Sequence, residues 1–195
     1  MKSMTNAIKR VFLAVNLPLS VKKVIENEVE KIKERMPESV RFIPSENWHI
    51  TVSFLGNQSD ENIVKISDVA KKVAANFAPI EAKFEKIVYG PSNANAKMIW
   101  LTTNYETSSR LEIIKQMIEN RLLEEGINLR LEHRKFNGHV TLARFDKNLG
   151  ISELPLNLED DLELDFLARS LDFMESDMRP SGATYSTLGK FEFFY

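Results

Sequence analysis

The chain contains no cysteine among its 195 residues. This absence excludes a disulfide framework, a thiolate metal site and a cysteine nucleophile. Long hydrophobic runs are also missing. The N-terminal stretch RVFLAVNLP has only five consecutive apolar residues, VFLAV, whereas a membrane helix needs roughly 18 or more. No small-residue cleavage site follows that stretch, so we expect a first buried strand there, no membrane segment, and a reducing cytoplasm as the location.

Positive charge is not in excess, because 26 lysines and arginines face 28 aspartates and glutamates, for a net charge of −2. A surface that coats nucleic acid through its phosphates needs a basic excess, which this chain lacks, although a small basic pocket stays compatible with it. The composition, 43% hydrophobic and 28% charged, is ordinary for a globular protein. We expect a monomer whose residues 1–195 form one domain made of two intertwined lobes.

Helical periodicity appears in three segments, each with a candidate N-cap, and Gly126 stands where the third helix would end. The predicted helices cover residues 19–36, 60–77 and 107–125, with N-caps at Ser20, Asp60 and Thr107.

The remaining apolar runs alternate and are separated by turn residues, as strands are. The predicted strands cover residues 10–17, 48–55, 79–89, 97–103, 139–145, 162–175 and 184–194. A strand–helix–strand unit occurs twice with similar spacing, since Leu13 precedes His49 by 36 positions and Leu101 precedes His139 by 38. The repeat predicts an α+β, bilobal fold in which two pseudo-symmetric lobes with antiparallel or mixed sheets line a central cleft, with helices outside.

Histidine is scarce, and two of the three histidines begin strands with the same His-x-Thr pattern. Alternate residues of a strand face the same way. His49, Thr51 and Ser53 are therefore predicted to share one face, as are His139 and Thr141, while the aliphatic residues between them face the core. Each strand would present an imidazole and a hydroxyl to the cleft. The third histidine, His133, has no such partner and is expected in a loop or on the surface.

Two histidines and two hydroxyls suit displacement at a phosphorus atom. Histidine titrates near neutral pH, so one ring can accept a proton while the other donates one, and threonine hydroxyls can donate to phosphate oxygens. A metal hydrolase is the competing hypothesis. It is disfavoured because the chain has three histidines, no cysteine and no HExxH spacing. We therefore expect neither a metal nor another cofactor.

Basic residues surround the second His-x-Thr segment: Arg130, Arg134 and Lys135 precede it, and Arg144 follows it. Guanidinium groups match phosphate geometry, so this cluster could attract an anionic ligand. Strict alternation would put Arg144 on the core side, opposite His139. Arg144 can reach the cleft only if the strand ends or bulges near Ala143.

These residues resemble the two-histidine (2H) phosphoesterase superfamily, and within it the RNA 2′,3′-cyclic phosphodiesterases, also called 2′-5′ RNA ligases. The resemblance spans RVFLAVNLP, VRFIPSENWHITVSFLG, FNGHVTLARF and the closing LDFMESDMRPSGATYSTLGKFEF. It implies that His49 and His139 are catalytic, that Thr51 and Thr141 hold the phosphate and that Arg144 contacts substrate. It further implies that His49 is the acid on the leaving 3′-oxygen and His139 the base on water.

The implied activity is metal-independent opening of a 2′,3′-cyclic phosphate at an RNA end to a 2′-phosphomonoester, with reversible 2′-5′ ligation in some members. The expected partners are RNA ends or nucleotides that carry such a phosphate. Two alternatives stay open: a 2H phosphodiesterase acting on another cyclic or 2′-5′-linked nucleotide, and a non-catalytic protein that binds a nucleotide or RNA end. The chain departs from the family where Asn137-Gly138 replaces a common Arg-Pro before the second histidine.

Overall fold

A computed structural model describes most of the chain: residues 8–92, 94, 96–132, 134–145, 149, 153–155, 158, 160–179 and 182–194. Its elements are β1 (Lys9–Asn16), α1 (Leu19–Lys33), β2 (Arg41–Phe42), the 3₁₀ turn η1 (Ser45–Asn47), β3 (His49–Gln58), α2 (Asp60–Ala74), β4 (Ile80–Gly90), β5 (Met98–Thr103), α3 (Tyr105–Glu124), β6 (His139–Arg144), β7 (Asp160–Ala168), β8 (Ser170–Arg179) and β9 (Gly182–Glu192).

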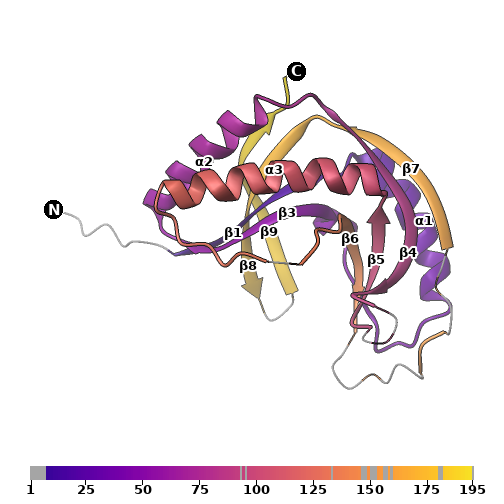
Figure 1. Cartoon of the computed structure of the whole chain (residues 1–195). Helices are drawn as coiled ribbons and strands as arrows, with labels where there is room; N and C mark the ends of the chain where they lie inside the picture. Colours follow the sequence, from indigo (N-terminus) through magenta and orange to yellow (C-terminus); the bar gives the residue numbers. More distant parts are fainter. Residues whose placement is uncertain are drawn as a thin grey trace.

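The strands form two sheets, with the orders β3-β1-β8-β9 and β2-β6-β5-β4-β7. Every described strand pair is antiparallel. Helices α2 and α3 lie together over the first sheet, and α1 lies against the second (Figure 1). The predicted α+β fold with two lobes is confirmed.

The repeated strand–helix–strand unit is visible in the topology. β1 and β3 are neighbours joined through α1, and β5 and β6 are neighbours joined through α3. The helices cross between the sheets, because α1 contacts β7 of the second sheet and α3 contacts β3 of the first. One hydrophobic cluster therefore includes residues of both sheets and all three helices, and burial of this shared core holds β3 against β6.

Several elements differ from the sequence prediction, and the first two helices end three residues earlier than predicted, at Lys33 and Ala74. Residues 162–175 were expected to form one strand, but they belong to β7 and β8, which pair in different sheets. A continuous alternating pattern could not reveal the change of sheet at Arg169. β2 was not predicted, since two residues carry no periodic signal. The N-caps lie earlier than expected: Ser59 instead of Asp60, Asn104 instead of Thr107, and Pro18 instead of Ser20.

The helix ends have clear physical causes. The Ser59 hydroxyl accepts a hydrogen bond from the backbone N–H of Asn62, and the Asn104 side chain accepts one from the N–H of Thr107. Both satisfy donors that the first turn of a helix leaves unpaired. Gly126 follows α3 with a φ of +77°, a conformation that glycine adopts without a Cβ penalty. This confirms the predicted end of the third helix.

Gly90 makes room for Trp100 between neighbouring strands β4 and β5. A Cβ added at Gly90 would overlap the indole carbons of Trp100, and the indole is almost fully buried. The absence of a side chain at residue 90 therefore lets Trp100 lie flat against the sheet, where its ring stacks on His139.

We predict that Gly90→Ala lowers the free energy of unfolding by about 1–3 kcal/mol, the usual cost of overpacking. Denaturant titration followed by circular dichroism measures it. In a Trp100→Leu background the same change should cost clearly less, because the overlapping ring has gone. An equal penalty in both backgrounds would contradict this explanation of Gly90.

Candidate active site

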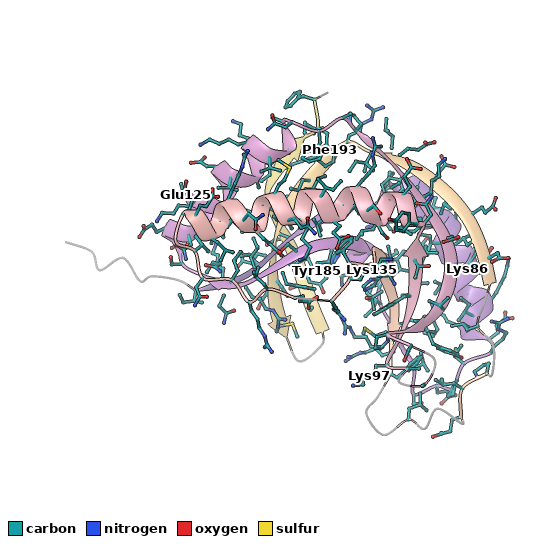
Figure 2. All side chains as sticks on the ribbon, viewed as in Figure 1. Lys86, Lys97, Glu125, Lys135, Tyr185 and Phe193 are labelled. Carbon is teal, nitrogen blue, oxygen red and sulfur yellow. The ribbon has the colours of Figure 1, made fainter. Side chains whose placement is uncertain are left out.

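His49 is the first residue of β3 and His139 is the first residue of β6. The two strands belong to different sheets and contact one another. The imidazoles are close enough that positive charge on His139 disfavours positive charge on His49. The structure thus brings together the two histidines that the repeat singled out. Figure 2 shows Tyr185, a neighbour of His49, near the middle of the molecule.

Both imidazoles are oriented by the same hydrogen bond. Nδ1 of His49 lies 2.8 Å from the carbonyl oxygen of Asn47, and Nδ1 of His139 lies 2.7 Å from that of Asn137. A carbonyl oxygen only accepts hydrogen bonds, so Nδ1 carries the proton in both rings. In the neutral rings Nε2 is then unprotonated, and it has no hydrogen-bond partner among the described residues. Each histidine therefore offers one free basic nitrogen.

A bulge in β3 decides which side chains accompany His49. Leu13 pairs with Ser53 and Ala14 pairs with Thr51, so Val52 is an extra residue. Val52 and Ser53 are both buried, while Phe54 is 55% exposed. The prediction that Ser53 shares a face with His49 is wrong, because the bulge turns Ser53 towards the core.

The buried Ser53 hydroxyl finds a partner on α3. It donates a 2.6 Å hydrogen bond to Glu119, and Glu119 is paired with Lys115 at 2.8 Å. Ser53 thus ties β3 to α3 on the core side, where an unpaired hydroxyl would be costly.

The same bulge occurs in β6. Ile99 pairs with Ala143 and Trp100 pairs with Thr141, which leaves Leu142 as the extra residue. Leu142 and Ala143 are fully buried, and Arg144 is exposed on the face that carries His139. From the sequence, Arg144 could reach the cleft only if the strand ended or bulged near Ala143, and β6 does bulge there. One guanidinium nitrogen of Arg144 lies 3.5 Å from the Met98 sulfur.

Thr51 and Thr141 lie two residues after their histidines and are half-buried on the same faces. Neither hydroxyl has a hydrogen-bond partner within the part of the chain that the structure describes. Two hydroxyl groups without a partner therefore lie on the strand faces that carry the two free imidazole nitrogens.

Aromatic rings surround the two histidines unequally. The centre of the His49 ring lies 4.9 Å from that of Phe12 and 5.0 Å from that of Tyr185, and the Tyr185 ring is nearly perpendicular to it. The His139 ring stacks on Trp100 with centroids 3.9 Å apart and 25° between the planes. The indole Nε1 of Trp100 is buried and has no partner among the described residues, so stacking and packing hold this ring in place.

Burial lowers the pKa of both histidines. Desolvation is the largest cause and lowers the pKa of His49 to about 4, with the charges of Lys22 and His139 lowering it further and the Asn47 carbonyl opposing them. Burial also lowers the pKa of His139. Arg134 and Arg144 act in the same direction there, while the Asn137 carbonyl and Glu132 oppose them. Both rings are thus mainly neutral at pH 7 in the unliganded protein.

The backbone before His139 is held tightly at Gly138. Its N–H donates to the Ser108 hydroxyl at 3.1 Å, and its carbonyl oxygen accepts from the Thr103 N–H at 2.8 Å. A Cβ at residue 138 would lie 2.6 Å from the Thr103 hydroxyl oxygen, so this close packing explains why glycine precedes the histidine here.

The basic cluster near His139 is divided by its contacts. Arg134 is paired with Glu132 at 3.0 Å, and Lys135 lies 5.2 Å from the centre of the Tyr105 ring. Arg130 is exposed. His133 lies outside the described residues. Arg144 is therefore the member of the cluster that the strand presents beside the histidine.

Phe12, Tyr185 and Trp100 were not identified as site residues from the sequence. They come from three other strands, and the sequence contains no short motif that links them to the histidines. Alternation along the strands could have pointed to two of them. Phe12 and Trp100 stand between buried aliphatic residues of β1 and β5, and their side chains therefore face the other side of the sheet. The pairing register between neighbouring strands, which the sequence does not reveal, was needed to place them beside His49 and His139.

Two further features are absent from the described residues. No group of three or more histidine, aspartate or glutamate side chains is arranged to hold a metal ion there. No helix there is both long enough and apolar enough to cross a lipid bilayer.

A sequence model of the LigT-like phosphoesterase family matches residues 15–100. The RNA 2′,3′-cyclic phosphodiesterase of Methanocaldococcus jannaschii is 25% identical over 92% of this chain and 98% of its own length. The enzyme of the same name from Archaeoglobus fulgidus is 24% identical over 94% of this chain and 99% of its own.

Solved structures share the fold. A crystal structure of a Thermus thermophilus protein covers 94% of this chain and 97% of its own, with a TM-score of 0.80 and 23% identity. Escherichia coli LigT complexed with 3′-AMP covers 97% of this chain and 100% of its own, with a TM-score of 0.72 and 19% identity. The matching family model, the relatives aligned along nearly the whole chain and the solved structures of the same fold agree: this chain is similar to the LigT-like phosphoesterases.

Proposed function

We propose that this protein hydrolyses 2′,3′-cyclic phosphate ends of RNA to 2′-phosphomonoesters, with His49 and His139 as its acid–base pair. The observation that carries the proposal is the matched arrangement of the two rings, each with Nδ1–H bound to a carbonyl, Nε2 free, and an unpartnered threonine hydroxyl on the same strand face. The names of the relatives supply the substrate.

The proposed reaction needs two proton transfers. A neutral imidazole takes a proton from water through Nε2 as the water oxygen attacks phosphorus, and the bond from phosphorus to the 3′-oxygen breaks. The other ring, protonated, gives its Nε2 proton to that oxygen. Thr51 and Thr141 donate hydrogen bonds to the non-bridging oxygens, and Arg144 adds positive charge near the phosphate. A ribose 5′-hydroxyl in place of water would give 2′-5′ ligation by the same steps.

The resemblance assigns the acid role to His49 and the base role to His139. The pKa of about 4 for His49 in the unliganded protein favours its neutral form. The assignment therefore requires the negative charge of the bound phosphate to raise that pKa.

His49→Ala and His139→Ala are each expected to lower turnover of a 2′,3′-cyclic nucleotide by about 10²–10⁴-fold, the usual contribution of a general acid or base. A cyclic analogue with sulfur at the bridging 3′ position separates the roles, since a thiolate leaves without protonation. On this analogue the His49→Ala variant should turn over nearly as fast as the wild type, whereas the His139→Ala variant should stay slow.

His133→Ala is the control for these assays, because the third histidine has no proposed role. Wild-type turnover by either of the other two variants, with circular dichroism spectra unchanged, would refute the acid–base pair. The assay is run with EDTA throughout. We expect the chelator to leave the rate unchanged, whereas loss that a divalent ion restores would indicate a metal-bound water instead.

The pH dependence follows from the lowered pKa values. The active form has one protonated and one neutral ring, and both rings are mainly neutral at pH 7. We therefore expect kcat/KM to rise as the pH falls from 7, to reach its maximum between about 4 and 6.5, and to fall when both rings are protonated.

The profile of kcat should lie at higher pH than that of kcat/KM, because the phosphate anion stabilises the imidazolium. Both limbs belong to the coupled pair rather than to one residue. Rates measured from pH 4 to 9 on a cyclic mononucleotide provide the test. A kcat/KM that rises steadily through neutral pH would contradict the assignment.

Thr51→Ala and Thr141→Ala are expected to lower kcat by about 10²-fold, as the loss of one transition-state hydrogen-bond donor does. Thr→Ser at either position keeps the hydroxyl and should retain most of the activity. If serine and alanine variants were equally impaired, the methyl group rather than the hydroxyl would matter, and the phosphate-binding role would be wrong.

A further inference from the structure

Phe54 occupies the position in β3 that Arg144 occupies in β6. Each is the fifth residue after its histidine, and each is turned onto the histidine face by the bulge that precedes it. Arg144 suits an anion. Phe54 presents a phenyl ring that is 55% exposed, so the matching position in the other strand presents an aromatic surface.

That aromatic surface is continuous with the active site. The Phe12 ring lies 4.9 Å from His49 and 6.0 Å from Phe54, so it connects the two. Phe12 is only 2% exposed, and Phe54 therefore supplies the accessible part. Aromatic side chains next to a phosphate site are suited to stack on nucleobases, because every base has a π face.

Arg10 continues the same line along β1. Val11, Leu13 and Val15 are buried in the main core, so Arg10 shares the opposite face with Phe12, about 7 Å further along the strand. Arg10 is exposed and lies opposite Asn57 of β3. It has no acidic partner among the described residues, whereas Lys9, on the other face, is paired with Glu175 at 3.5 Å.

We propose that the strip from His49 through Phe12 and Phe54 to Arg10 binds the RNA strand that leads to the cyclic end. Phe54 stacks on a base near the reacting phosphate, and Arg10 pairs with a backbone phosphate further toward the 5′ end. The inference rests on the proposed function and deepens it: the preferred substrate is a single-stranded oligonucleotide end rather than a free cyclic mononucleotide. A terminal cyclic phosphate leaves all the remaining chain on its 5′ side, which supplies the phosphate for Arg10.

The experiment compares kcat/KM for a 2′,3′-cyclic mononucleotide with that for a five-nucleotide RNA carrying the same end. The wild-type protein should prefer the oligonucleotide. Phe54→Leu should lower kcat/KM on the oligonucleotide by about 5- to 100-fold, corresponding to one lost base stack. Arg10→Gln should lower it on the oligonucleotide alone, most strongly at low salt, with mononucleotide turnover unchanged.

Binding provides a readout that does not need turnover. Fluorescence anisotropy with a five-nucleotide RNA ending in a 2′-phosphate should give weaker binding for both variants. For Arg10→Gln, the slope of log Kd against log salt should decrease by about 0.7, the value for one phosphate contact on a single strand. Phe194→Leu and Arg110→Gln, an exposed phenylalanine and an exposed arginine away from the strip, are the matched controls.

Failure of this inference differs from failure of the proposed function. If the wild type turns over both substrates equally and neither variant changes binding or the salt slope, the strip does not bind RNA, although the phosphodiesterase activity stands. If the wild type turns over neither substrate, the proposed function fails, and the anisotropy measurement still tests the strip: unchanged binding in both variants overturns it, and weakened binding supports it.

Discussion

The hydrogen bond from each imidazole Nδ1 to the carbonyl two residues earlier is the constraint on which the site depends. It leaves Nε2 as the free nitrogen in both rings and sets the direction in which it points. The carbonyls are themselves fixed, since η1 ends at Asn47 and Gly138 is packed against Thr103 and Ser108. Without that bond a half-buried imidazole could adopt either tautomer, and the pair would lose its matched geometry.

The rings also differ in what lies beneath them. Phe12 and a nearly perpendicular Tyr185 ring enclose His49, whereas the face of Trp100 stacks on His139. A stacked indole presents electron density to the imidazole, and two arginines oppose it by disfavouring charge on His139. The strand repeat is therefore nearly symmetric in its backbone and asymmetric in the electrostatics around its two histidines, as the proposed division into acid and base would need.

Much of this arrangement could be predicted from the sequence. The two His-x-Thr segments, their strands and the strand–helix–strand repeat depend on local alternation and spacing, which the chain displays directly. Ser53 and the strand over residues 162–175 were placed wrongly because a bulge and a change of sheet depend on pairing with distant strands. Phe12 and Tyr185 were missed for the same reason. Arg144 could be predicted only in part. Strand alternation showed that it needs a bulge to reach the cleft, but not that the bulge is present.

The bulges have a consequence for how such a site can diversify. In each strand, the histidine and threonine precede the extra residue, and the fifth position follows it. A single substitution at that position changes the surface offered to a ligand, whereas the histidine, the threonine and the core residues keep their places. If the strand kept all its residues but lost the bulge, regular alternation would instead send Phe54 or Arg144 into the core. The bulge therefore places the fifth side chain on the ligand side, and the surface offered there can change while the histidine and threonine stay in place.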